Sequence, residues 1–126
     1  MDTTLTRRRF ERLVVKALKE LPEEIRSLMD NVAILIQATP TPAQLAEVGL
    51  GADNTLLGLY QGVPLTDRTS GYGMTLPDRI TIFQQPIEQM CVNDTEITLQ
   101  VRRTVIHEIA HHFGIGDERL REMGWG

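Results

Sequence analysis

All three histidines of the chain lie near its C-terminus, in the segment His107-Glu108-Ile109-Ala110-His111-His112. His107 and His111 are four residues apart, so on a helix they lie on one face, one turn apart. Two imidazoles placed in this way can bind one metal ion, and zinc accepts imidazole nitrogen at about 2.0–2.1 Å. In a His-Glu-x-x-His arrangement the glutamate accepts a proton from water beside the ion. The segment therefore predicts a zinc (Zn2+) site with Glu108 as a general base.

A catalytic zinc ion usually has three protein ligands, so two histidines leave one position to fill. We prefer Asp117, because it follows His111 with five residues between them, one of which is Gly114. This spacing matches His-Glu-x-x-His-x-x-Gly-x-x-His with aspartate in place of the last histidine, and Gly114 allows the chain to leave the helix and turn back. A carboxylate oxygen is an ordinary zinc ligand. Glu118 and Glu122 are the alternative third ligands.

The other residues with reactive or metal-binding side chains have simpler interpretations. His112 points about 100° around a helix from His111, which favours a packing or supporting role. We expect Met123 and Cys91 to be ordinary packing residues. Three further side chains could stabilise an oxyanion: Tyr60, Tyr72 and Arg68. We favour sheet packing for Tyr60 and solvated loop positions for Tyr72 and Arg68.

The helix that must carry the histidines is marked at both ends. Asn93-Asp94-Thr95-Glu96 has the form of a capping box, with Asn93 as the cap and Glu96 at the third helical position. Gly114 is suited to end the helix. One apolar face follows from residues at helical spacing: Ile97, Val101, Val105, Ile109 and Phe113. At about 1.5 Å per residue, this helix would be roughly 30 Å long.

The remaining elements alternate between helix and strand signals. Residues 5–21 place apolar side chains at i, i+3, i+4 and i+7, which predicts an N-terminal helix. Three short apolar segments predict strands: 32–36, 56–61 and 79–83. We expect Pro86 to end the last strand, and Thr41 to cap a short helix with Pro42 at its first position. Residues 62–78 predict a long loop, and such loops are often functional.

The composition limits the class of protein. A length of 126 residues suits one domain, residues 1–126, with a core that needs no disulfide. The single cysteine fits a reducing compartment, and neither a signal peptide nor a long apolar span is evident. We therefore expect a cytoplasmic protein without a membrane partner, and its oligomeric state stays open. The net charge of −4 argues against a nucleic-acid partner, since nucleic-acid-binding proteins usually carry a basic face.

Three segments resemble the bacterial minimal zincin-like metallopeptidase family: Leu56–Leu65, Leu76–Ile80 and Val101–Ile115. The resemblance extends from the N-terminal helix onward. It implies an α+β class and a minimal zincin-like fold, in which a small mixed sheet packs on an N-terminal helix and a long C-terminal active-site helix. It also implies zinc held by His107, His111 and Asp117, with Glu108 as the base.

The reaction that we expect is zinc-dependent hydrolysis of a peptide bond in a peptide or protein substrate. By analogy with larger zincins, residues 56–61 should form an exposed sheet edge to which an extended peptide can add, with residues 69–73 beside it. One alternative is a metal-dependent endoribonuclease of the ribosomal-RNA maturation type. Those nucleases have similar histidine spacing but lack the glutamate after the first histidine. Another alternative is a non-catalytic metal-binding module. Glu108 and the acidic net charge favour a peptidase.

Overall fold

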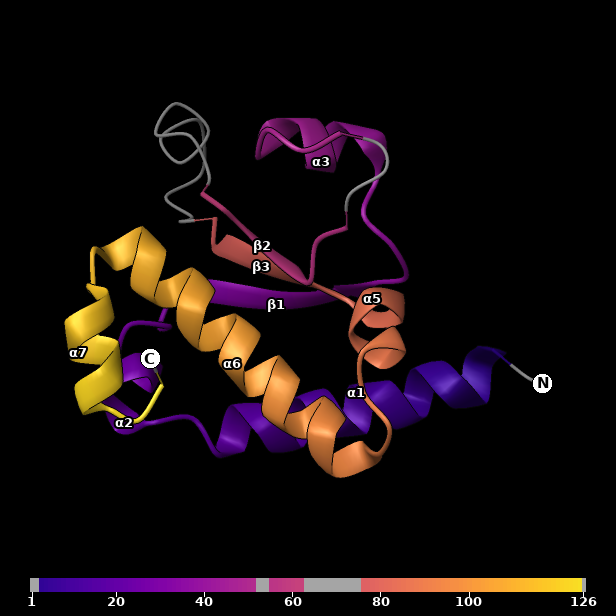
Figure 1. The fold of residues 1–126 in the computed structure, drawn as a ribbon, viewed down its shortest axis with the longest axis horizontal. Coiled ribbons are helices and arrows are strands. Elements are labelled where there is room, and N and C mark those ends of the chain that lie inside the picture. Colours follow the sequence, from indigo (N-terminus) through magenta and orange to yellow (C-terminus); the bar gives the residue numbers. More distant parts are fainter. Residues whose placement is uncertain (1–2, 52–54, 63–75, 126) are drawn as a thin grey trace.

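The computed structural model describes residues 3–51, 55–62 and 76–125, and Figure 1 shows how its helices and strands are arranged. The elements, in chain order, are α1 (Thr3–Lys19), α2 (Glu23–Arg26), β1 (Val32–Gln37), α3 (Pro42–Glu47), β2 (Gly58–Gln61), β3 (Asp78–Phe83), α5 (Gln84–Gln89), α6 (Asp94–Phe113) and α7 (Asp117–Glu122). The expected positions of Arg68, Tyr72 and residues 69–73 lie outside the described residues.

The three strands form a mixed sheet in the order β1-β3-β2. β1 is parallel to β3, with Ile34 opposite Ile80, and β2 is antiparallel to β3, with Tyr60 opposite Ile80. The last four residues of β3 are buried, as befits a central strand with both neighbours present. Among the described residues β2 is an edge strand, which confirms the edge position expected for residues 56–61, although the strand begins at Gly58.

The hydrophobic core lies between the sheet, α1 and α6. Its buried side chains come from all three: Phe10, Val14 and Ala17 of α1, Ile80 and Ile82 of β3, and Val101, Val105, Ile106 and Ile109 of α6. α3 lies on the far side of the sheet from α1 (Figure 1). The α+β class and the packing of a small mixed sheet on the N-terminal and long C-terminal helices are thus confirmed. Within the described segments, no helix is both long and apolar enough to cross a membrane.

Local signals define α6 much as expected. The Asn93 side chain accepts a hydrogen bond from the Glu96 backbone N–H at 2.9 Å. The return bond is displaced by one residue, because the Glu96 carboxylate accepts from the N–H of Val92 at 3.0 Å. At the other end Gly114 adopts a left-handed conformation, with φ of 72°, and Ile115 N–H bonds Ala110 C=O at 2.8 Å. That left-handed turn lets the chain reverse into α7.

Two short helices differ from the expected elements. We expected Pro86 to end the third strand, but the strand already ends at Phe83 and α5 follows directly. Pro86 lies in the first turn of α5, where the missing N–H of a proline has no intrahelical partner to lose. α7 also lies in a segment for which no element was expected. Both helices have six residues, too few to form without tertiary packing.

Candidate metal centre

The core fixes the part of α6 that carries the histidine motif. Ile106, Ile109 and Ala110 are fully buried, so they hold the helix against the sheet and α1. The motif residues next to them are more accessible: His107 and Glu108 are half-buried and His111 is exposed. The ring centroids of His107 and His111 are 6.4 Å apart, with the ring planes tilted by 52°. The structure thus places both imidazoles one turn apart on the accessible side of one helix.

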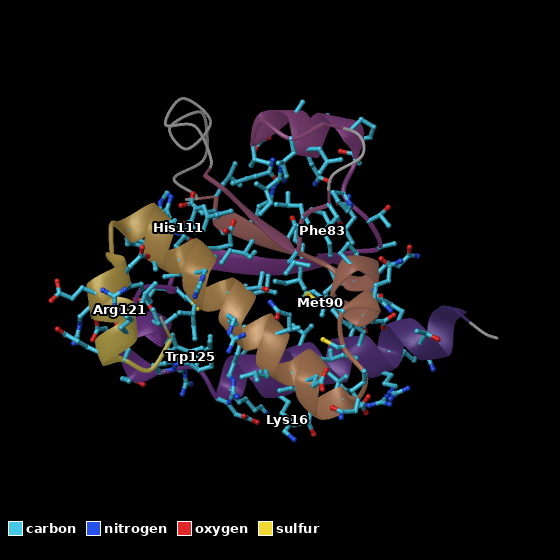
Figure 2. All side chains as sticks on the ribbon, in the orientation of Figure 1. Lys16, Phe83, Met90, His111, Arg121 and Trp125 are labelled. Atoms are coloured by element: carbon cyan, nitrogen blue, oxygen red, sulfur yellow. The ribbon has the colours of Figure 1, made fainter. Side chains whose placement is uncertain are left out.

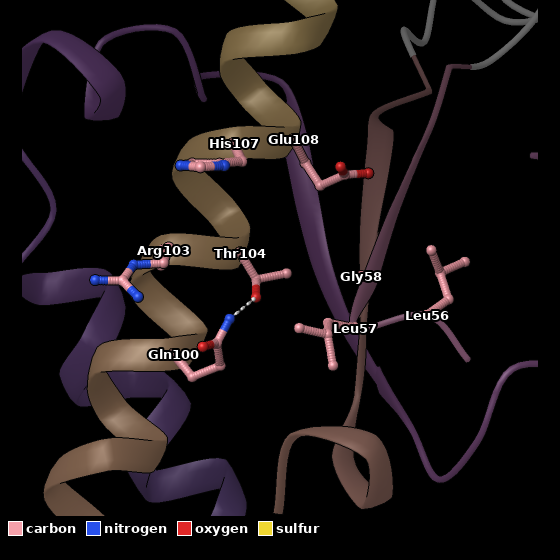
Figure 3. Close-up of a pocket in the computed structure, with 8 residues that line it drawn as sticks. All are labelled: Leu56, Leu57, Gly58, Gln100, Arg103, Thr104, His107 and Glu108. Atoms are coloured by element: carbon pink, nitrogen blue, oxygen red, sulfur yellow. Dashed lines mark hydrogen bonds between the residues drawn. The ribbon is translucent and has the colours of Figure 1, made fainter. Parts of the chain in front are cut away.

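Glu108 lies against the edge strand. Its carboxylate oxygen Oε1 accepts a hydrogen bond from the backbone N–H of Tyr60 in β2 at 2.9 Å. Figure 3 shows Glu108 directed toward β2, whereas His107 lies on the other side of α6. Burial raises the pKa of Glu108, while the Tyr60 N–H and the nearby His111 and His107 act in the opposite direction. The general-base candidate therefore sits where the edge strand and the histidine helix meet.

The C-terminal segment holds the first histidine of the motif. Nε2 of His107 is 3.0 Å from the backbone carbonyl oxygen of Trp125. A carbonyl only accepts, so Nε2 carries the hydrogen, and in the neutral ring Nδ1 keeps the lone pair. Trp125 is itself anchored, since its N–H donates to Leu120 C=O at 2.7 Å and the Arg102 guanidinium lies 5.3 Å from its ring centroid. Figure 2 shows Trp125 beside α6.

The contact between the His107 ring and the C-terminal segment could not be predicted from the sequence. The two residues are 18 positions apart and lie in different elements. The one local signal is Gly124, which has a φ of 88° and turns the chain after α7. A turn signal alone does not tell which side chain the following carbonyl will meet.

His112 belongs to a second cluster beside the motif. Its ring stacks on Tyr60 with centroids 3.9 Å apart and an interplanar angle of 16°. The Tyr60 hydroxyl donates to Oδ2 of Asp78 at 2.6 Å, and Nε2 of His112 is 3.9 Å from the same oxygen. The expected packing or supporting role of His112 agrees with this arrangement. Asp78 was not singled out from the sequence, because a carboxylate at the start of a strand is an ordinary turn signal.

Asp117, the expected third ligand, lies on a different helix from His107 and His111. Asp117 is the first residue of α7 and is exposed, as is Glu118. Glu122 pairs with Arg119 at 3.0 Å, so its carboxylate already has a cationic partner. Among the described residues, no three His, Cys, Asp or Glu side chains form a group that could hold a metal ion. The structure brings His107, Glu108 and His111 together on α6, and Asp117 stays a prediction.

The chemistry of the donor set nevertheless fits zinc. Imidazole nitrogen is a common zinc ligand, and the two rings lie one turn apart on the same helix. Cys91 contributes no ligand to this region: it is half-buried against the hydrophobic core, and burial raises the pKa of its thiol. Met123 also packs against the core, as expected.

A groove lies next to the motif, between the start of β2 and α6. It has a volume of about 230 Å³ and is shown in Figure 3. Its lining residues are Leu56, Leu57, Gly58, Gln100, Arg103, Thr104, His107 and Glu108. The groove therefore ends at two residues of the candidate centre.

Comparisons with known proteins bear on the family and the fold of the chain. A family model described as zincin-like metallopeptidase matches residues 29–125. A solved structure of a conserved hypothetical protein from Thermus thermophilus is 24% identical, with a TM-score of 0.53, and the match covers 83% of this chain and 91% of that chain. At this identity the likeness concerns the fold alone. No curated protein matches the chain.

Proposed function

The chain belongs to the zincin-like metallopeptidase family, and from this premise we propose that it hydrolyses peptide bonds with a zinc ion held by His107, His111 and Asp117. In this proposal Glu108 is the general base. The observation that carries the proposal is the position of the Glu108 carboxylate, 2.9 Å from the backbone N–H of an edge strand and one residue from the first histidine.

The residues that would hold the ion differ in how far they are preorganised. His107 and His111 are presented by a helix whose core residues fix it, whereas Asp117 begins a separate short helix. When bound, zinc would supply Lewis acidity, which polarises an amide carbonyl and makes water more acidic. The proposal assigns the rest of the chemistry to side chains of α6 and to the edge of the sheet.

Glu108 has the reach and the chemistry for proton transfer. One carboxylate oxygen accepts a hydrogen bond from the Tyr60 N–H, which restrains the group and leaves the second oxygen for a proton. A carboxylate in this position accepts a proton from water and then passes it to the leaving nitrogen of the cleaved amide. The hydrogen bond also keeps the base beside the strand on which a substrate would lie.

The outer edge of β2 suits an extended peptide. In this antiparallel pair the N–H of Phe83 bonds the C=O of Leu57, so the backbone groups of Leu57 and Leu59 face β3. The alternate residues Gly58 and Tyr60 direct their backbone groups to the outer edge, which the Tyr60 N–H bond to Glu108 reflects. A peptide that adds to this edge as a further strand gains backbone hydrogen bonds and passes the base.

A metal assay and a cleavage screen together test the proposal. We expect purified protein to contain about one zinc ion per chain and to cleave members of a peptide library. Both properties should disappear when a chelator removes the metal and return when zinc is added. His107→Ala should lose zinc and cleavage together, because it removes one imidazole ligand. Cleavage of structured RNA and of no peptide would instead support the endoribonuclease alternative.

A further inference from the structure

Three residues of α6 form a row that contacts β2. Thr104, Glu108 and His112 follow one another at intervals of four, so they lie on one face of the helix. Figure 3 shows the first two on the side of α6 that faces β2. The Thr104 methyl carbon lies so near Gly58 that a Cβ there would be only 2.5 Å from it. One turn further on, Glu108 accepts from the Tyr60 N–H, and after another turn the His112 ring stacks on the Tyr60 ring. The general-base candidate is therefore the middle residue of a continuous contact between the helix and the edge strand.

Tyr60 makes two of these three contacts through different parts of one residue. Its backbone N–H donates to the Glu108 carboxylate at 2.9 Å. Its ring lies against His112, with centroids 3.9 Å apart and ring planes inclined by 16°. Rings in this arrangement touch over their faces, so the tyrosine ring cannot rotate away from α6 without losing that contact. Because only two side-chain rotations separate the ring from the backbone, a restraint on the ring also restrains the direction of the N–H.

Asp78 fixes the far end of the Tyr60 side chain. Tyr60 pairs with Ile80 in the antiparallel ladder, so Asp78 is its diagonal neighbour on the same face, within reach of a long aromatic side chain. The tyrosine hydroxyl donates to Oδ2 of Asp78 at 2.6 Å, a length typical of a charge-assisted hydrogen bond. Asp78 is itself anchored, since its backbone N–H donates to the C=O of Asn31 at 3.0 Å. The Tyr60 ring is thus held at one face by α6 and at its hydroxyl by β3.

The orientation of Glu108 depends on this arrangement. Within the part of the chain that the structure describes, the Tyr60 N–H is the one hydrogen-bond donor to the Glu108 carboxylate. A general base must lie within hydrogen-bond reach of the proton that it accepts, and a misplacement of about 1 Å can cost about a hundredfold in rate. A residue that directs this N–H therefore affects proton transfer without touching the substrate.

We propose that Tyr60, Asp78 and His112 are positioning residues for the base: Asp78 and His112 fix the Tyr60 side chain, and Tyr60 fixes the Glu108 carboxylate. This inference rests on the proposed function, because it gives the three residues a task in the reaction assigned to Glu108. It assigns neither proton transfer nor metal binding to His112. A role in packing alone would stabilise the fold and leave the kcat of the folded protein unchanged.

The first test measures amide hydrogen exchange by NMR in zinc-loaded protein at two neighbouring residues of β2. The Tyr60 N–H points to Glu108, whereas the backbone groups of Leu59 face β3. In Asp78→Ala we expect the Tyr60 amide to exchange at least about tenfold faster, with the Leu59 amide unchanged. Asp78→Asn keeps an acceptor oxygen for the tyrosine hydroxyl and should restore most of the protection. Equal acceleration at both amides would show that the whole strand has loosened. That result, or unchanged exchange at Tyr60, overturns the proposal.

The second test compares steady-state cleavage of a verified peptide by variants with the zinc content of the parent protein. Asp78→Ala and His112→Ala should lower kcat about tenfold and leave KM within about twofold, because the outer edge of β2 stays in place through its pairing with β3. Asp78→Asn and His112→Phe, which keeps a ring against Tyr60, should recover most of the loss. Asp94→Ala removes a carboxylate that pairs with Arg9 at the start of α6 and, as the control, should leave kcat unchanged. Unchanged kcat in both alanine variants, or a loss that neither conservative variant recovers, overturns the positioning roles.

Together the two tests separate the positioning roles from the proposed function. If the parent protein cleaves no peptide while the Tyr60 amide responds to Asp78→Ala and recovers in Asp78→Asn, the positioning of Glu108 stands and the peptidase function fails. If the parent protein cleaves peptides and the Tyr60 amide does not respond, the peptidase function stands and the positioning roles fail.

Discussion

Replacing Glu108 by glutamine separates the role of the base from the roles of the ligands. Glutamine has nearly the same size, and its amide oxygen can still accept the N–H of Tyr60, which the carboxylate accepts at 2.9 Å. The half-buried negative charge disappears, which relieves the desolvation that raises the pKa of this group. The free energy of unfolding should therefore change by less than about 1 kcal/mol. Zinc content should also stay the same, because His107, His111 and Asp117 are untouched.

Hydrolysis should fall steeply in the same variant. Loss of a general base costs about 10²–10⁴-fold in rate, or about 2.7–5.4 kcal/mol in the activation barrier. Glu108→Ala should lose activity similarly and should also be less stable by about 1 kcal/mol, because it leaves the Tyr60 N–H without its acceptor. Glu23→Gln, at an exposed position of α2, is the matched control and should change neither property.

The assays are steady-state cleavage of a verified peptide, metal analysis and chemical denaturation. Loss of zinc from Glu108→Gln would show that Glu108 is a ligand or a structural residue. Retention of zinc together with full activity would place the base elsewhere and remove the central support of the peptidase mechanism.

Three further variants test the surroundings of the centre. Asp117→Ala should weaken zinc binding in a chelator competition, whereas Glu122→Ala should not, and equal zinc affinity in the parent and Asp117→Ala would rule out this third ligand. Trp125→Ala should destabilise the fold by about 2 kcal/mol through lost packing and release the His107 ring, seen by NMR as faster solvent exchange of the hydrogen on Nε2; Trp125→Phe should keep that hydrogen protected, and equal exchange in both variants would refute the role of the Trp125 carbonyl. Gly114→Ala should cost about 1 kcal/mol in thermal unfolding because its φ is 72°, while Gly116→Ala at φ −78° should cost less, and equal costs would refute the strain argument.

Local physical chemistry was sufficient to predict α6 and the placement of His107 and His111 on one face of it. Asn93 and Gly114 act on backbone groups within a few residues of themselves, so the ends of the helix follow from the nearby sequence. The helical repeat then places His107 and His111 on one face whatever else the chain does. The same holds for the cap at Thr41 and for the segments that became β1 and β3.

The short helices and the surroundings of the motif depend on distant contacts. α5 and α7 have six residues each, and helices of that length form only where packing supports them. Tyr60 and Glu108 are 48 residues apart, and Tyr60 and Asp78 are 18 apart. No local pattern specifies which backbone N–H or carboxylate will be met across such separations.

The sequence by itself therefore determined which reactive groups lie close together: the imidazoles of His107 and His111 and the carboxylate of Glu108, on a helix that ends at Gly114. Only the tertiary structure decided how these groups are used. In the folded chain β2 is an edge strand and the Tyr60 N–H donates to Glu108. The Trp125 carbonyl contacts His107, and Arg103 lies at the groove beside β2. The reason is that helix periodicity and capping act over a few residues, whereas strand order and the positions of backbone donors and acceptors follow from packing the whole core.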